Sequence, residues 1–192
     1  MDVKVMGHLD FRRESDSLRK LKNVQSVEGG HSVDVIARKQ GSDEEHAIKV
    51  MGKTDKLNQI TIIDGKLPQA SGECLVDEWY AQQNDLKTGD VLNLSSGNED
   101  DLKDTLKDTT YKITGIGSSS EYLSRSRGST GIGTGTLSGF IVVQPSEFSS
   151  DIYTEVYLTA KGAKQERAYS ECLQKQSKTA GRRDQRYFQN RK

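Results

Sequence analysis

The apolar residues of this chain occur in short runs that have the length of β-strands. The runs at 73–77, 111–116 and 140–143 are four to six residues long and lie between polar or glycine-containing turns. Runs of this length favour strands over helices. In 27–37 and again in 152–159 apolar and polar positions alternate, which is typical of a strand with one buried face. Shorter runs at 47–51 and 91–94 also suit strands.

Helical patterns are fewer and shorter. Residues 16–23 follow Ser15, a good helix cap, and 78–84 carry the only tryptophan. A single helical turn is expected at 56–60. The end of the chain, 162–192, has a weakly amphipathic helical pattern, and 161–192 holds ten Lys or Arg against three acids. Strands and helices together predict the α+β class, with this basic end as a solvated helix.

Composition limits the classes of function. Lys plus Arg and Asp plus Glu number 28 each among 192 residues, so no global charge favours a nucleic-acid partner. Hydrophobic residues make up 32%, which predicts a modest or divided core. The chain has no apolar run long enough to span a bilayer and no signal-peptide pattern at its start. It opens on a strand pattern and ends on a charged helix, which suggests a segment of a larger protein.

The glycine-rich stretch 124–140, SRSRGSTGIGTGTLSGF, is the first candidate for chemistry. A phosphate-binding loop needs a Lys-Ser/Thr pair and a helix after its last glycine. Here Gly135 is followed by TLSG and a strand pattern, and the glycine spacing does not fit the dinucleotide fingerprint. We therefore predict a loop between two strands and no cofactor.

Metal and catalytic patterns are equally lacking. The histidines share no ligand spacing, and the acidic stretch 95–108 lacks the order of a calcium loop. Cys74 and Cys172 form no C-x-x-C pair; they are interpreted as small buried thiols, with a disulfide as the alternative. No G-x-S-x-G sequence exists, and no pair of carboxylates is singled out. We expect no metal site and no enzyme.

Three segments resemble one known family. They are 64–77, DGKLPQASGECLVD; 86–92, LKTGDVL; and 111–117, YKITGIG, followed by 122–128, YLSRSRG. In this order they are similar to the MacB-like core domain of FtsX-type ABC-transporter permeases, which lies on the outer face of the membrane. The resemblance extends over about residues 1–164, and the basic stretch 176–192 departs from it.

The resemblance implies a two-lobed fold. A βαββ-type, porter-like α/β lobe would comprise 1–59 and 144–192, and a smaller β-rich lobe would be inserted as 60–143. Transmembrane helices would lie outside both ends of this chain. The domain would then be on the extracytoplasmic face, periplasmic or extracellular, of the cell membrane.

The implied function is mechanical. Such a domain couples ATP hydrolysis by a cytoplasmic ATP-binding subunit to export of a peptide or lipid, or to an adaptor or cell-wall enzyme, and a second permease copy is a further expected partner. Arg125, Arg127 and Gly128, taken as exposed on a protruding loop, are the expected partner contacts. A soluble extracellular peptide- or polysaccharide-binding module is the alternative, and a hydrolase using a carboxylate pair is a third hypothesis.

Overall fold

The computed structural model describes residues 2–6, 18–98, 101–122 and 124–161, and these form two β-sheets. The smaller sheet is antiparallel and has the order β1 (Asp2–Met6), β10 (Glu155–Ala160), β2 (Val24–Gly30). The larger sheet has the order β5 (Ile60–Gly65), β8 (Thr110–Ser119), β6 (Glu73–Asp77), β9 (Gly139–Val143), β4 (Glu45–Gly52), β3 (Ser32–Lys39), β7 (Val91–Ser95).

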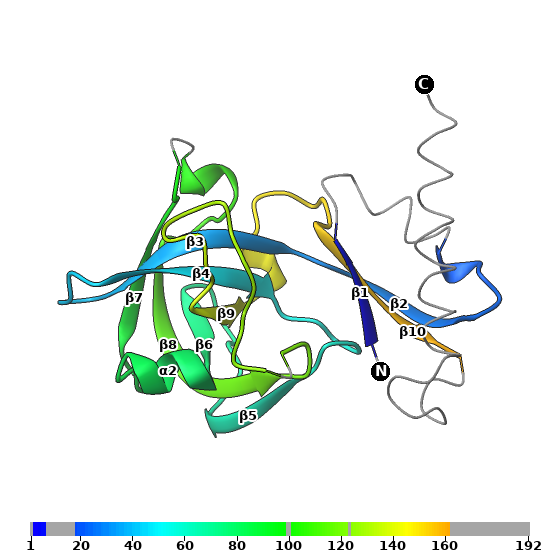
Figure 1. Cartoon of the computed structure of the whole chain (residues 1–192), viewed down its shortest axis with the longest axis horizontal. Coiled ribbons are helices and arrows are strands. Elements are labelled where there is room, and N and C mark those ends of the chain that lie inside the picture. The colour runs from blue at the N-terminus through cyan, green and yellow to red at the C-terminus, as the bar shows by residue number, and fades with distance from the viewer. Residues whose placement is uncertain (1, 7–17, 99–100, 123, 162–192) are drawn as a thin grey trace.

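The larger sheet closes on itself. Strand β7, the last in the order, also pairs with β8, so six strands form a ring and β5 is added to the outside of β8. The first part of β8 pairs with β7, and its last part pairs with β5. Closure removes the exposed edges of the six strands, whereas β5 keeps one. Figure 1 shows this barrel on the left and the smaller sheet on the right.

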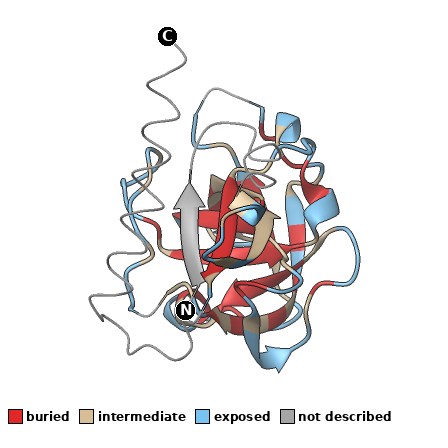
Figure 2. Ribbon diagram, turned by 90° about the vertical axis from the view of Figure 1, so that its right-hand side faces the viewer, coloured by how far each residue is buried: buried red, intermediate tan, exposed pale blue. Residues whose placement is uncertain are grey.

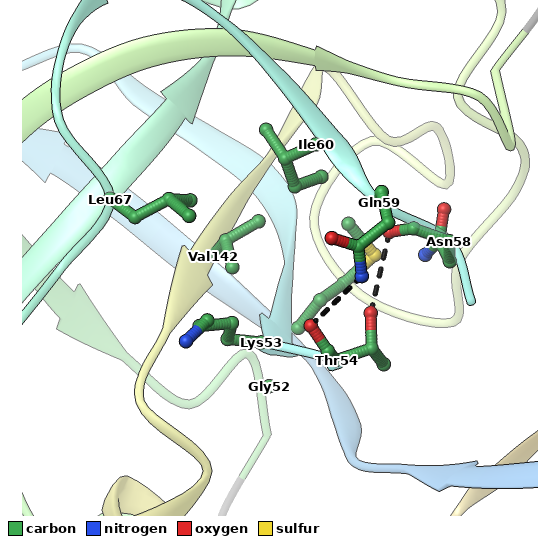
Figure 3. Close-up of a pocket in the computed structure, with 9 residues that line it drawn as sticks. Gly52, Lys53, Thr54, Asn58, Gln59, Ile60, Leu67 and Val142 are labelled. Carbon is green, nitrogen blue, oxygen red and sulfur yellow. Dashed lines mark hydrogen bonds between the residues drawn. The ribbon is translucent and has the colours of Figure 1, made fainter. Parts of the chain in front are cut away.

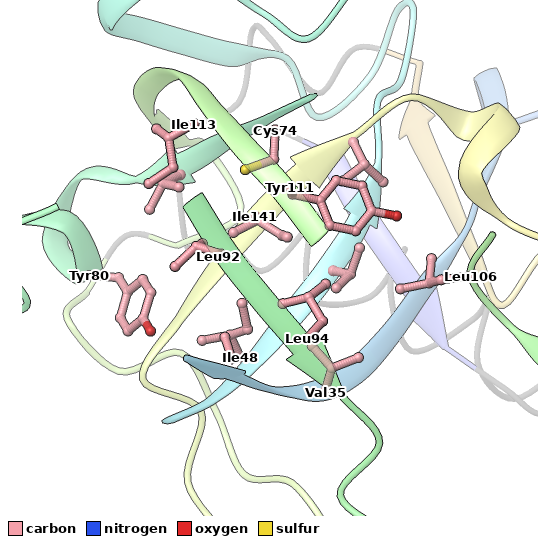
Figure 4. Packing of buried hydrophobic residues seen from close by; sticks show 14 of the residues in the cluster. Val35, Ile48, Cys74, Tyr80, Leu92, Leu94, Leu106, Tyr111, Ile113 and Ile141 are labelled. Carbon is pink, nitrogen blue, oxygen red and sulfur yellow. The ribbon is translucent and has the colours of Figure 1, made fainter. Parts of the chain in front are cut away.

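The barrel holds the main core. Its interior is filled by buried side chains from several strands, including Val35, Ile48, Leu92, Ile113 and Ile141, and Figure 2 shows the buried residues at its centre (Figure 4 shows their packing). A second, smaller cluster lies outside this core; it contains Met51, Leu75, Phe140 and Val142. The divided core agrees with the modest apolar content of the chain.

Helices are short in the described residues. They include α2 (Glu78–Gln83) and two 3₁₀ turns, Leu102–Asp104 and Pro145–Glu147. The predicted helix at 78–84 is therefore confirmed. The helical turn predicted at 56–60 is wrong: residues 55–58 form bends instead. Of the predicted helix 16–23 only Leu18 and Arg19 are helical among the described residues, and the basic end 162–192 lies outside them.

The strand predictions differ in their outcome. The strand at 73–77 matches β6, and those at 47–51, 91–94, 111–116 and 140–143 lie within β4, β7, β8 and β9. The single strand predicted at 27–37 is wrong, because the chain passes at His31 from β2 in one sheet to β3 in the other. The half-buried strand predicted at 152–159 is shorter, and Glu155–Thr159 are all buried because both faces of β10 are covered.

The fold is thus mostly β, with few helices. Strands β3 and β4, which the sequence analysis assigned to the first lobe, pair within the same sheet as β5–β9. The βαββ arrangement and the division of the chain into 1–59 plus 144–192 and 60–143 stay predictions.

Candidate partner-binding surface

The glycine-rich stretch connects β8 to β9, as predicted, and folds into a small hairpin. Ser129 and Thr136 form an isolated antiparallel bridge. The N–H of Leu137 donates to the carbonyl of Gly128 at 3.0 Å, which closes the base of the hairpin. Gly128 has φ +104°, a backbone conformation that favours glycine, and it is exposed. Strand β9 follows the hairpin, whereas a phosphate-binding loop is followed by a helix.

The inner side of this hairpin packs on the barrel, although its outer side is exposed. A Cβ atom on Gly133 would lie 3.1 Å from Cδ1 of Ile36 and 3.3 Å from Cβ of Ala47, on β3 and β4. The N–H of Ser138 donates to the carbonyl of Ala47 at 2.8 Å. Backbone contacts and close packing therefore hold the inner side of this segment against two strands, and its role as a protruding partner contact stays a prediction.

Arg127 faces inward and binds Asp77. Its Nε donates to Oδ2 at 2.8 Å and its Nη2 to Oδ1 at 2.9 Å. The two side chains are 8% and 0% exposed. The guanidinium carbon also lies 5.0 Å from the ring centroid of Tyr122. The expectation of an exposed Arg127 is wrong, because its donors are used by a buried carboxylate at the end of β6.

Arg125, in contrast, is exposed as predicted. Its guanidinium lies over the ring of Trp79 on α2, 4.2 Å from the centroid, and Trp79 is half-buried. A cation over an indole face gains electrostatic attraction from the ring. Arg125, Trp79 and Gly128 form what we call the Arg125 surface. Whether a partner binds there stays a prediction. Trp79 and Asp77 could not be assigned to this surface from the sequence, because no local spacing relates them to the loop.

Two carboxylates, Glu147 and Asp108, both contact the hydroxyl of Ser71. Glu147 is 1% exposed and accepts hydrogen bonds from the hydroxyls of Ser71 at 2.7 Å and Tyr111 at 3.0 Å. Ser71 also contacts Asp108 at 2.7 Å. Burial, and then the nearby Glu147 carboxylate, raises the pKa of Tyr111, so the phenol stays protonated and can donate. Through these contacts Glu147 connects its 3₁₀ turn to the loop that holds Ser71 and to strand β8, which holds Tyr111. The Glu147 side chain is enclosed.

A shallow pocket lies between the end of β4 and the start of β5 (Figure 3). Met51, Ile60, Leu67 and Val142 give it an apolar floor, and the other lining residues are Gly52, Lys53, Thr54, Asn58 and Gln59. Gln59 is held by a hydrogen bond from its Nε2 to the carbonyl of Thr54 at 3.2 Å. Its lining includes no carboxylate. Within the described residues no group of three or more His, Cys, Asp or Glu side chains is placed to bind a metal ion.

Comparison with known proteins gives structural neighbours only. No protein family and no curated protein sequence matches the chain. The extracellular domain of the noncanonic ABC-type transporter YknZ from Gram-positive bacteria aligns with 13% identity over 80% of this chain and 74% of that chain, with a TM-score of 0.48. The periplasmic region of MacB from Actinobacillus actinomycetemcomitans aligns with 9% identity over 92% and 79%, with a TM-score of 0.49.

A permease protein domain from Porphyromonas gingivalis aligns with 10% identity over 78% of this chain and 62% of that chain, with a TM-score of 0.47. Among the described residues no helix has the length and apolar character to cross a membrane. The three aligned structures are thus an extracellular domain, a periplasmic region and a permease domain, each with a β-rich fold similar to part of this chain at 13% identity or less.

Proposed function

We propose that this chain is the extracytoplasmic domain of an ABC-transporter permease, without enzymatic activity, and that it transmits movement from membrane helices to a partner outside the membrane. One observation carries the proposal. The first and third segments that resemble the family, 64–77 and 122–128, are joined by the buried pair of Asp77 and Arg127. Two coincidental turn sequences would not be expected to contribute the two halves of one bidentate ion pair.

The architecture suits a mechanical role. A closed barrel is difficult to deform, because each of its strands is hydrogen-bonded on both sides. The smaller sheet is connected to it through the nearly continuous strands β2 and β3, visible as one long ribbon in Figure 1. Membrane helices next to the smaller sheet would move it, and the barrel would carry the Arg125 surface with it. ATP hydrolysis would be supplied by a cytoplasmic subunit, and the partner would be cargo, an adaptor, a cell-wall enzyme or a second permease.

The test uses the natural full-length protein, purified from detergent-solubilised membranes through an affinity tag. We expect an ATP-binding subunit or domain to be recovered with it and to hydrolyse ATP. The matched control carries a substitution in the ATP-binding site of that subunit. If the purified sample hydrolyses ATP no faster than this control, the proposal is contradicted.

A soluble binding module is the second candidate, and one observation favours it. Strand β5 has a free edge in the described structure, and its Ile62 and Ile63 are 44% and 52% exposed. An extended peptide can add to such an edge by main-chain hydrogen bonds. Replacing both residues with Lys would abolish peptide binding in that case and would leave ATP-dependent activity unchanged if the first proposal holds.

A further inference from the structure

Two segments of the chain connect the two sheets, and we call this region the joint. The chain crosses from β2 to β3 at His31 and returns to β10 through residues 144–154. Two glycines, Gly29 and Gly30, precede His31, and aromatic rings pack directly on them: a Cβ on Gly30 would lie 2.7 Å from Cε2 of Tyr157, and one on Gly29 would overlap Tyr153. Small residues at the end of an element are common at hinges.

Glu28, the residue before these glycines, makes a contact across the joint. Its carboxylate accepts three backbone hydrogen bonds from the loop that follows β4: from Asp55 at 2.6 Å, Lys56 at 3.0 Å and Leu57 at 2.7 Å. Consecutive N–H groups that converge on one anion form a nest, and hydrogen bonds to a charged acceptor are the stronger kind. A residue of the smaller sheet is thus bound by a loop of the barrel.

Other contacts across the joint are also polar. Glu155, 1% exposed on β10, accepts a hydrogen bond from Ser32 of β3 at 2.6 Å and lies 3.6 Å from Nζ of Lys49 on β4. Tyr157, on the same strand, donates to this carboxylate at 2.7 Å and so orients it within the smaller sheet. Directional contacts of this kind fix one arrangement of the sheets, whereas an apolar joint would allow sliding. The joint therefore favours discrete states over gradual deformation.

We propose that Gly29–Gly30–His31 is a hinge between the two sheets and that Glu28 is the latch that holds it closed. The position of Glu28 supports this role. Glu28 is only partly buried, and Asp55 and Lys56 are exposed, so water can replace the three hydrogen bonds when the latch opens. The contacts of the buried Glu155 with Ser32 and Lys49 cross the same joint, so they give the closed state its geometry and make its opening costly. The hinge and the latch do not depend on the proposed role in a transporter.

The test compares Glu28→Gln with Glu44→Gln, which removes the same charge from an exposed turn where no side-chain contact is lost. Hydrogen exchange is measured on the whole chain. In Glu28→Gln we expect the amides of residues 55–57 to exchange about tenfold faster, because bonds to a charged acceptor are lost. The amides of β6 and β9 should keep their wild-type rates in both variants. Wild-type rates at 55–57 in Glu28→Gln would overturn the latch.

The distance between the sheets is measured with two spin labels, at Gln25→Cys and Thr61→Cys, in a Cys172→Ser background. Both labelled positions are exposed, and Cys74 is buried. We expect one narrow distance distribution in the parent and in Glu44→Gln, and a second, separate population in Glu28→Gln. Faster exchange at 55–57 with an unchanged distance distribution would mean that Glu28 only orders its loop, and would overturn the hinge.

If Glu28→Gln destabilises the whole fold, faster exchange in β6 and β9 will reveal it. In that case, native-state hydrogen exchange of the wild-type chain in low denaturant decides whether the hinge opens separately from global unfolding. The hinge predicts that amides 55–57 and those that join β2 to β3 open in one partial unfolding step with a shared denaturant dependence. Exchange of both groups only through global unfolding would overturn it.

Discussion

Arg127 donates two parallel hydrogen bonds to Asp77, a residue 50 positions earlier in the sequence, inside a contact that excludes water. The pair fixes the base of the glycine-rich hairpin to the end of β6, where α2 begins. It therefore separates two arginines that look equivalent in the sequence, because Arg127 holds the fold together and Arg125 remains available on the surface.

Removing one partner of this pair should destabilise the fold strongly. Asp77→Ala leaves the Arg127 guanidinium buried without its counter-charge, and such a change typically costs about 3–5 kcal/mol. Arg127→Lys should also destabilise, since an ammonium cannot reproduce the bidentate geometry. Urea unfolding measures both, with Arg125→Lys as the matched control, for which a change of at most about 0.5 kcal/mol is expected. Equal effects of the two lysine substitutions would contradict the assignment of Arg127 as structural.

The Arg125 surface should be the contact site for a partner. A photo-crosslinking amino acid at position 125 should capture a second protein when the full-length natural protein is illuminated in cells. The control is the same amino acid at Asp43, which is exposed at the turn between β3 and β4. Crosslinks of equal yield at both positions would mean that the surface has no special role.

Buried tyrosines should make the chain unstable at alkaline pH. Burial raises the pKa values of Tyr80, Tyr111, Tyr122 and Tyr157. Unfolded tyrosine loses its proton near pH 10, whereas these phenols keep theirs in the folded chain. Their contribution to stability is therefore complete below about pH 10 and is lost as the pH rises above it.

The measurement is the free energy of unfolding between neutral and strongly alkaline pH. Tyr111→Phe removes one of the titrating groups and should reduce the slope above about pH 10, although the loss of its hydrogen bond to Glu147 lowers stability at neutral pH. A stability that is unchanged across this range would show that the phenols are accessible to solvent.

Cys74 should be unreactive in the folded chain. Burial raises the pKa of its thiol, so almost no thiolate forms at neutral pH, and its side chain is not exposed. In a Cys172→Ser variant, alkylation should occur only as fast as the protein unfolds, and denaturant should accelerate it to the rate of a free cysteine. Rapid alkylation of the native variant would contradict the packing of β6 in the barrel.

Local patterns were sufficient to predict several elements. The strand at 73–77 was predictable because a short apolar run lies there between turns, and the helix α2 that follows it was also predicted from its local sequence. The closure of the barrel could not be predicted, because the pairing of β7 with β8 depends on residues brought together by the whole sheet. The break at His31 had a local signal in Gly29 and Gly30, but the alternation on either side continued through it.

The surface was only partly predictable for the same reason. The arginines and glycines of the loop identified the segment, but their exposure depends on Asp77 and Trp79, which lie far away in the sequence. Neither partner has a spacing that relates it to residues 125–128. Charge alone suggested two exposed arginines, whereas tertiary contacts left one.

The location of the domain is the central claim, and protease accessibility in intact cells tests it most directly. The natural full-length protein is followed by membrane fractionation, and protease is added before and after lysis. The account predicts that the protein sediments with membranes and that cleavage occurs in this domain when protease is added from outside, after permeabilisation of any outer membrane. A soluble protein, or a membrane protein in which the domain is protected until the cytoplasmic membrane is broken, would contradict it.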